Sequence, residues 1–272
     1  MKTTCLRVTV ISQFLLLILF ASCNLIEYHP YDLESKNQPS GINQTNINLL
    51  QKNDDEQDTV RFIFMGDTQR HYDETQDFVN AANKLNNIDF VIHGGDITDF
   101  GMSKEYVWIH DIMKKLKVPY VALIGNHDIL GHGKDVYQKI YGDLNFSFAF
   151  RKTRFICLNT NALEFDYSTP VPDFDYMMGF LKDSATIERT IVVMHAPPYS
   201  DEFNDNSALM FNYVIEHYKN PEFCIHAHNH VQSMNDLFNN GILYYGCDDI
   251  SRRTFLLFTL AGNTYSYKTV KF

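Results

Sequence analysis

Short apolar runs alternate with amphipathic segments in the first half of the chain. The runs cover residues 60–65, 88–93 and 120–124, and each has the length of a buried strand. Between them, apolar side chains recur at the i, i+3, i+4 and i+7 spacing of a helix face, at Phe78, Ala81, Ala82 and Leu85 and again at Ile109, Ile112, Met113 and Leu116. This strand–helix–strand–helix–strand order predicts a parallel sheet with right-handed crossovers.

The second half has more strand-like runs, at residues 145–150, 154–159, 191–194 and 223–225, with helical spacing near residues 174–181 and 210–217. Residues 242–246, 254–260 and 265–270 alternate as antiparallel strands do, so we expect the chain to end in an antiparallel group. The pattern as a whole predicts an α/β fold in which two β-rich halves pack as facing sheets with helices outside.

The first 22 residues have the composition of a targeting segment. Lys2 and Arg7 give a positive start, residues 14–20 are apolar, and Ala21-Ser22 precede Cys23. This resembles the lipobox of bacterial lipoproteins, which predicts lipidation of Cys23, a membrane anchor and a place in the cell envelope. The alternative is an ordinary secretory signal with an incidental cysteine, which predicts a secreted or periplasmic soluble protein.

Residues 23–58 are polar and show no helical or strand period, so we expect a tether there and one domain over residues 59–272. The net charge of the chain is −10 at pH 7. Such a surface repels polyanions and argues against nucleic acid as a general partner. A phosphorylated substrate stays possible because bound divalent ions can reverse the local field.

Polar residues able to bind a metal ion follow five of the apolar runs, which continue as FIFMGDTQ, FVIHGGDITD, VALIGNHD, IVVMHAPP and FCIHAHNH. The carboxyl ends of parallel strands meet in one crevice, so these side chains should converge. Carboxylate, amide and imidazole together suit Mn, Fe or Zn better than Ca or Mg. The residues that end the runs are Asp67, Asp96, Asn126, His195, His228 and His230.

The order GD-x-Q, GD-x-x-D, GNHD, a strand ending in His, and H-x-H resembles the calcineurin-like metallophosphoesterase superfamily over about residues 60–231. The resemblance implies a β-sandwich flanked by helices that holds two divalent metal ions. By motif position, Asp67 and His230 would bind the first ion. Asp96 would bridge the two ions, and the second would be bound by Asn126, His195 and His228.

Gln69 departs from the family pattern, which usually has histidine two residues after the first aspartate. Its amide oxygen can still coordinate the first ion, more weakly than an imidazole. The resemblance also implies that Asp99 pairs with His127, orients its imidazole and favours the protonated ring. The alternative for Asp99 is to cap a helix that begins near Ser103.

The implied function is hydrolysis of a phosphate monoester or diester by a hydroxide that two metal ions activate, with His127 as general acid. Arg70, Arg252 and Arg253 are the cations available for a remaining phosphate oxygen, or else are solvated surface residues. The alternative function is that of a non-catalytic surface binding lipoprotein that keeps the fold, and Gln69 is the feature that favours it.

Overall fold

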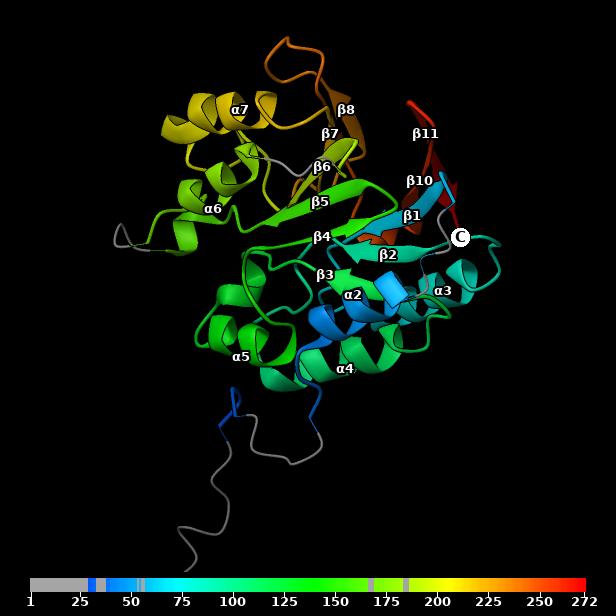
Figure 1. Cartoon of the computed structure of the whole chain (residues 1–272). Coiled ribbons are helices and arrows are strands. Elements are labelled where there is room, and N and C mark those ends of the chain that lie inside the picture. The colour runs from blue at the N-terminus through cyan, green and yellow to red at the C-terminus, as the bar shows by residue number, and fades with distance from the viewer. Residues whose placement is uncertain (1–28, 33–37, 53, 55–56, 166–168, 183–185) are drawn as a thin grey trace, which may run out of the picture.

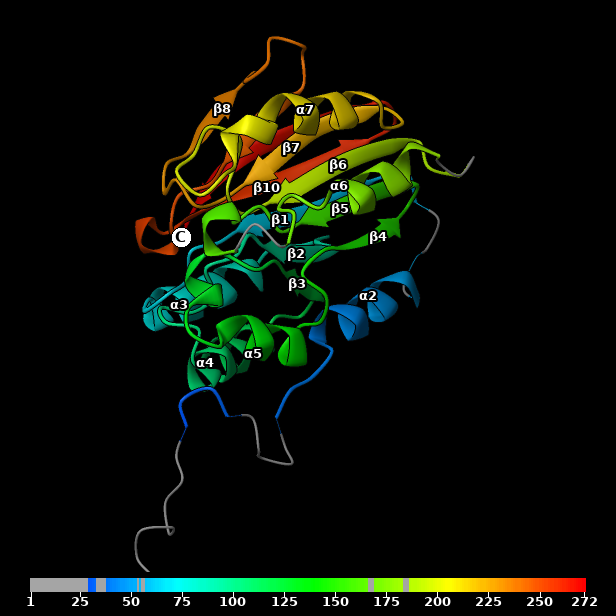
Figure 2. The ribbon, with the colours of Figure 1, turned by 90° about the vertical axis from the view of Figure 1, so that its left-hand side faces the viewer.

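The computed structural model describes residues 29–32, 38–52, 54, 57–165, 169–182 and 186–272. They form four layers, with two facing sheets in the middle and helices on both outer sides (Figures 1 and 2). The strand order is β11-β10-β1-β2-β3 in the first sheet and β4-β5-β6-β7-β9-β8 in the second. The predicted α/β fold with two sheets flanked by helices is confirmed.

The first sheet contains the predicted parallel unit. Its strands β1 (Val60–Met65), β2 (Phe90–His93) and β3 (Tyr120–Ala122) are parallel, and α3 (Tyr72–Ala82) and α4 (Ser103–Met113) connect them. Two antiparallel strands, β10 (Thr254–Ala261) and β11 (Thr264–Lys271), extend the sheet beside β1.

The second sheet has a parallel centre with antiparallel edges. It comprises β4 (Phe146–Phe150), β5 (Thr153–Leu158), β6 (Arg189–Met194), β7 (Pro221–His226), β8 (Ser233–Asn235) and β9 (Leu243–Gly246). The expectation that residues 242–246 join the final antiparallel group is wrong, because β9 pairs parallel to β7 in the second sheet. Residues 227–242 are long enough for a crossover, and β8 within them pairs antiparallel to β9.

Helices cover both outer faces (Figure 2). The helices α3, α4 and α5 (Gly133–Ile140) lie on the first sheet, whereas α6 (Phe174–Met178) and α7 (Ala208–Glu216) lie on the second. The short 3-10 turns are η2 (His127–Ile129), η3 (Ala162–Glu164), η4 (Gly179–Leu181), η5 (Asp205–Ser207) and η6 (Ile250–Arg252).

Aromatic side chains fill the space between the sheets. The Phe62 ring of β1 stacks on Phe258 at 5.1 Å and on Phe90 at 5.4 Å, and it meets Phe155 of the other sheet edge-on at 5.3 Å. All four rings are fully or almost fully buried. Burial of this size holds the two sheets together and therefore fixes the strand ends that carry the site.

The tether prediction is wrong for residues 42–52, which form the helix α2 (Ile42–Lys52). Its residues Ile42, Ile47 and Leu50 are buried, and the Asn43 amide exchanges two hydrogen bonds of 2.9 Å with the backbone of Ala122 on β3. The asparagines that suggest a linker thus form hydrogen bonds with backbone groups at the open edge of the first sheet.

Cys23 and the predicted targeting segment lie outside the described residues. Among the residues that are described, no helix is both long and apolar enough to cross a bilayer.

Candidate metal centre

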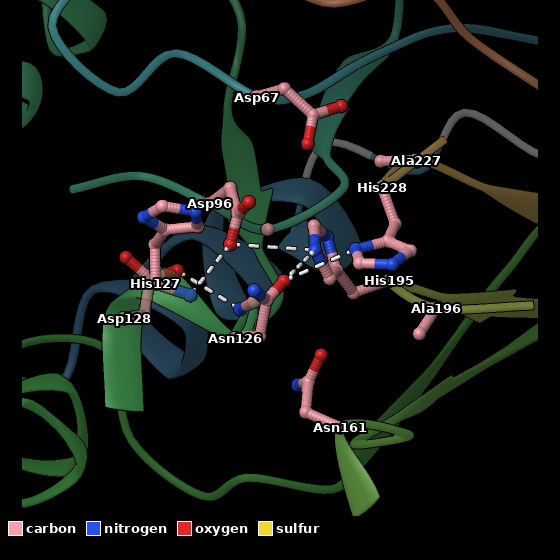
Figure 3. A network of polar contacts seen from close by, with 12 residues as sticks. Asp67, Asp96, Asn126, His127, Asp128, Asn161, His195, Ala196, Ala227 and His228 are labelled. Atoms are coloured by element: carbon pink, nitrogen blue, oxygen red, sulfur yellow. Dashed lines mark hydrogen bonds and ion pairs between the residues drawn. The ribbon is translucent and has the colours of Figure 1, made fainter. Parts of the chain in front are cut away.

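The strand ends bring predicted ligands from both sheets together, and Figure 3 labels five of them: Asp67, Asp96, Asn126, His195 and His228. Asp67, Asp96 and Asn126 follow β1, β2 and β3, and the histidines follow β6 and β7. One ligand atom each of Asp67, Asp96 and His230 lie within 4.8 Å of one another. Asp67 and His230 are 163 residues apart in the sequence and therefore meet as the sequence pattern predicts.

The first group of ligands contains buried oxygens that lack hydrogen-bond partners. Asp67 is fully buried, and neither of its carboxylate oxygens accepts a hydrogen bond within the described structure. The Nε2 atom of His230 lies 3.5 Å from Asp67 Oδ1, and the buried Gln69 Oε1 is also without a partner. A buried carboxylate without partners is costly, and a bound cation would remove that cost, so these residues fit a metal ion.

The second group of predicted ligands is Asn126, His195 and His228, whose acceptor atoms face one another. His195 Nδ1 is 2.9 Å from the carbonyl of Gly94, which can only accept, so Nδ1 carries the proton of the neutral ring. The other nitrogen, Nε2, then directs a lone pair at Asn126 Oδ1, 3.0 Å away, and at Asp96 Oδ1, 3.4 Å away.

His228 has the opposite tautomer, with its proton on Nε2. Its Nε2–H donates to Asp201 Oδ1 at 2.7 Å, and its Nδ1 faces Asn126 Oδ1 at 3.2 Å. Two imidazole lone pairs and an amide oxygen thus converge beside Asp96, which is the donor set of a metal ion of Mn, Fe or Zn type. Asp201 is not among the sequence-predicted residues, because an isolated aspartate in a loop carries no motif.

The charges of the centre are strongly coupled. Burial raises the pKa of Asp67 above its ordinary value. Burial also lowers the pKa of His195, but the adjacent Asp96 carboxylate outweighs it and raises that pKa to about 9. His195 in turn outweighs burial at Asp96 and lowers its pKa. A proton on His195 and a metal ion would compete for the same lone pair.

The backbone at the ligands is strained. Asp67, Asp96, His228 and His230 all have positive φ angles, between 53° and 66°. Each such residue costs on the order of 1–3 kcal/mol, and such residues cluster at functional sites. Gly125 is required for a different reason, the close approach of Asp96, because an added Cβ at position 125 would lie 2.2 Å from Asp96 Oδ1.

Asp128 braces the loops that carry Asp96 and Asn126. Its buried carboxylate accepts the backbone N–H groups of Ile97, Thr98 and Gly125 at 2.8–3.1 Å. Burial raises the pKa of Asp128 to about 7, and the Asp96 charge adds to the rise. The letter D of GNHD is the only sequence signal for this residue, and the motif alone does not show what it contacts.

His127 lies at the edge of the centre, beside Asp99. Its Nδ1–H donates to the backbone carbonyl of Asp99 at 3.0 Å, and the Asp99 carboxylate is 3.9 Å from the same nitrogen. The expected pairing is therefore made mainly through the backbone, and His127 Nε2 is left to exchange a proton. The alternative role of Asp99 as a helix cap is wrong, because the Glu105 carboxylate accepts the N–H of Met102 there.

The three arginines are placed differently. Arg70 contacts the Asp99 carboxylate and is 60% exposed, so it lies at the mouth of the centre. Arg252 is 70% exposed, with its Nε 3.9 Å from Asp249. Arg253 pairs with Asp77 on α3 at 2.6 Å, and this contact directs it away from the ligands.

Comparison with known proteins agrees with this fold. A dimetal phosphatase from Danio rerio is 13% identical with a TM-score of 0.61, and the match covers 78% of this chain and 97% of that one. The purple acid phosphatase PPD1 from yellow lupin is 13% identical with a TM-score of 0.59, over 79% of this chain and 52% of that one. These likenesses show the fold.

A probable cyclic nucleotide phosphodiesterase from Xenorhabdus bovienii is 28% identical over 88 residues, which are 32% of this chain. The match spans 33% of the length of that relative. The model of the calcineurin-like phosphoesterase family matches residues 60–232, which include all the proposed metal ligands. The chain therefore belongs to the calcineurin-like phosphoesterase family.

Proposed function

We propose that this protein hydrolyses a phosphate monoester or diester at a centre of two divalent metal ions, Mn, Fe or Zn. The observation that carries the proposal is the pair of ligand groups that share Asp96. One group has Asp67, Gln69 and His230, and the other has Asn126, His195 and His228. The first contains buried oxygens without hydrogen-bond partners in the described structure, and in the second two imidazole nitrogens face the Asn126 side-chain oxygen.

The two ions, when bound, would bind phosphate oxygens and lower the pKa of a water nucleophile. The chain supplies the remaining functions. His127, fixed by its Nδ1–H bond to Asp99, offers Nε2 for protonation of the departing alcohol. Arg70 contacts the Asp99 carboxylate and is largely exposed, so it would be the cation that binds a phosphate oxygen.

The test is hydrolysis of 4-nitrophenyl phosphate and bis(4-nitrophenyl) phosphate by the purified protein after loading with Mn, Fe or Zn. We expect hydrolysis of at least one ester, and loss of that activity in Asp96→Ala. An enzyme that is inactive with both esters and all three metals would contradict the proposal. Activity that persists in Asp96→Ala would do so as well.

The alternative, a binding lipoprotein with a weak first metal site, rests on Gln69. What supports Gln69 as a ligand is its Oε1 atom, which is buried without a hydrogen-bond partner within the described structure. Metal content distinguishes the two functions, because a binding protein would be purified from metal-replete medium without the first ion.

We also propose that Cys23 is lipidated and anchors the protein to a membrane of the cell envelope. The basis is the order of basic, apolar and small residues before Cys23. Cys23→Ser should release the protein from membranes and leave hydrolysis unchanged. Continued sedimentation of this variant with membranes after a salt wash would argue against the anchor.

A further inference from the structure

A cavity of about 720 Å³ has residues 162–165 and 169–171 on one side and residues 200–206 on the other. This volume is typical of small-molecule sites. The walls combine apolar side chains such as Leu163, Phe165 and Phe203 with the carboxylates of Asp201 and Asp205. No lysine, arginine or histidine is found among the described residues that line it.

The cavity adjoins the metal centre. Asp201 lines it and also hydrogen-bonds to His228. The backbone of Glu202 accepts the N–H of Ala162 at 2.8 Å, which joins the two loops. On the other loop, Asn161 directly precedes η3, and its side-chain amide donates to the backbone carbonyl of Ile124, two residues before Asn126, at 3.1 Å.

The electrostatic character of this region is negative. Glu202 is 9% exposed, and its Oε2 is buried without a partner in the described structure. Burial raises the pKa of Glu202 to about 7, and the charges of Glu164 and Asp201 add to the rise. An anionic group placed here would meet further repulsion, whereas an uncharged or cationic group would not.

We propose that this cavity binds the leaving group of the ester, and that it selects an uncharged or cationic organic alcohol with an apolar body over an anionic one. The inference rests on the proposed phosphoesterase function and adds the substrate class. The phosphate would lie at the metal centre, so the alcohol must extend away from it, and the cavity adjoins the centre beside His228 and beside the segment that precedes Asn126. The apolar walls then contact the body of the alcohol, and the carboxylates exclude a second anion.

The test compares phenyl phosphate with 4-carboxyphenyl phosphate, or their methyl diesters if the enzyme is a diesterase. The wild type should have the higher kcat/KM for the uncharged ester. Leu163→Lys places a cation on the cavity wall, at a residue that is 69% exposed and outside the three apolar cores. It should shift the ratio of kcat/KM values toward the carboxylated ester by about threefold to tenfold, the size of a partly screened charge pair.

Leu49→Lys is the matched control, because Leu49 is an exposed leucine on α2 and does not line the cavity. In Leu49→Lys, the ratio of the kcat/KM values for the two esters should equal that of the wild type. Equal shifts in both variants, or none in Leu163→Lys, would overturn the subsite while leaving phosphate-ester hydrolysis intact. Failure of the metal-loaded wild type to hydrolyse either ester would overturn the proposed function, and the subsite with it.

Discussion

Removal of the Asp201 carboxylate should weaken the second metal site selectively. Asp201 accepts the Nε2–H of His228 at 2.7 Å, which fixes the tautomer whose Nδ1 lone pair faces Asn126 Oδ1. In Asp201→Ala the ring can adopt either tautomer and can rotate. A proton on Nδ1 would then block coordination, whereas the first group of ligands has no contact with Asp201 among the described hydrogen bonds and ion pairs.

The exposure of the Asp201 side chain determines how much metal affinity should be lost. Loss of a hydrogen-bond partner behind a metal-binding histidine typically costs 10–100-fold in metal affinity. Asp201 has 86% of its side chain exposed, so solvent screens the charge and water can replace part of the hydrogen bond. We therefore expect the lower end of that range, about tenfold weaker binding of the second ion.

The assay is calorimetric titration of the metal-free protein with Zn²⁺ or Mn²⁺, fitted to two sites. Asp205→Ala is the control, because it removes the same charge from the same loop, where Asp205 accepts the N–H of Tyr199 instead of a histidine proton. In Asp201→Ala, metal binding should weaken at one of the two sites. In Asp205→Ala, the affinity of both sites should stay unchanged. Equal losses in both variants would mean that loop order or net charge is responsible, and unchanged affinity in Asp201→Ala would refute the tautomer argument.

Three further predictions concern the same centre. His127→Asn should lower kcat by roughly 10²–10⁴-fold with unchanged metal content; the loss should be smaller for nitrophenyl esters than for alkyl esters, and equal losses would exclude a proton-donor role. Gln69→Ala should lose the first ion in preference to the second on dialysis against a weak chelator, while Gln69→His should hold it more tightly; elemental analysis showing equal retention would mean that Gln69 is not a ligand. Gly125→Ala should displace Asp96 and reduce metal content, whereas Gly179→Ala, which meets no atom within 4 Å, should not; normal metal content in Gly125→Ala would contradict the close approach seen here.

The convergence of the strand-end side chains could be predicted from the order of the elements and from the direction of the strands. Parallel strands end on one side of a sheet, so Asp67, Asp96 and Asn126 had to meet once βαβαβ order was established. Which ligand atom of each histidine faces the centre could not be predicted. That depends on contacts such as His195 with Gly94 and His228 with Asp201, and the partners are distant in sequence.

The errors have a common physical cause. The helix α2 is rich in asparagine and glutamine, and its stability comes from burial of Ile47 and from the bond between Asn43 and Ala122, neither of which is a local property. Strand β9 alternates as an antiparallel strand does, yet it lies between β7 and β8 and pairs in parallel with β7. In both cases tertiary contacts decide a structure for which the local pattern is ambiguous.

The most direct test of the account is a crystal structure of the protein loaded with Mn²⁺, with metal positions taken from anomalous scattering. We expect two peaks per chain on either side of Asp96. One should lie among Asp67, Gln69 and His230, and the other among Asn126, His195 and His228. A single peak, or two peaks that do not share Asp96, would contradict the dinuclear centre on which the proposed function depends.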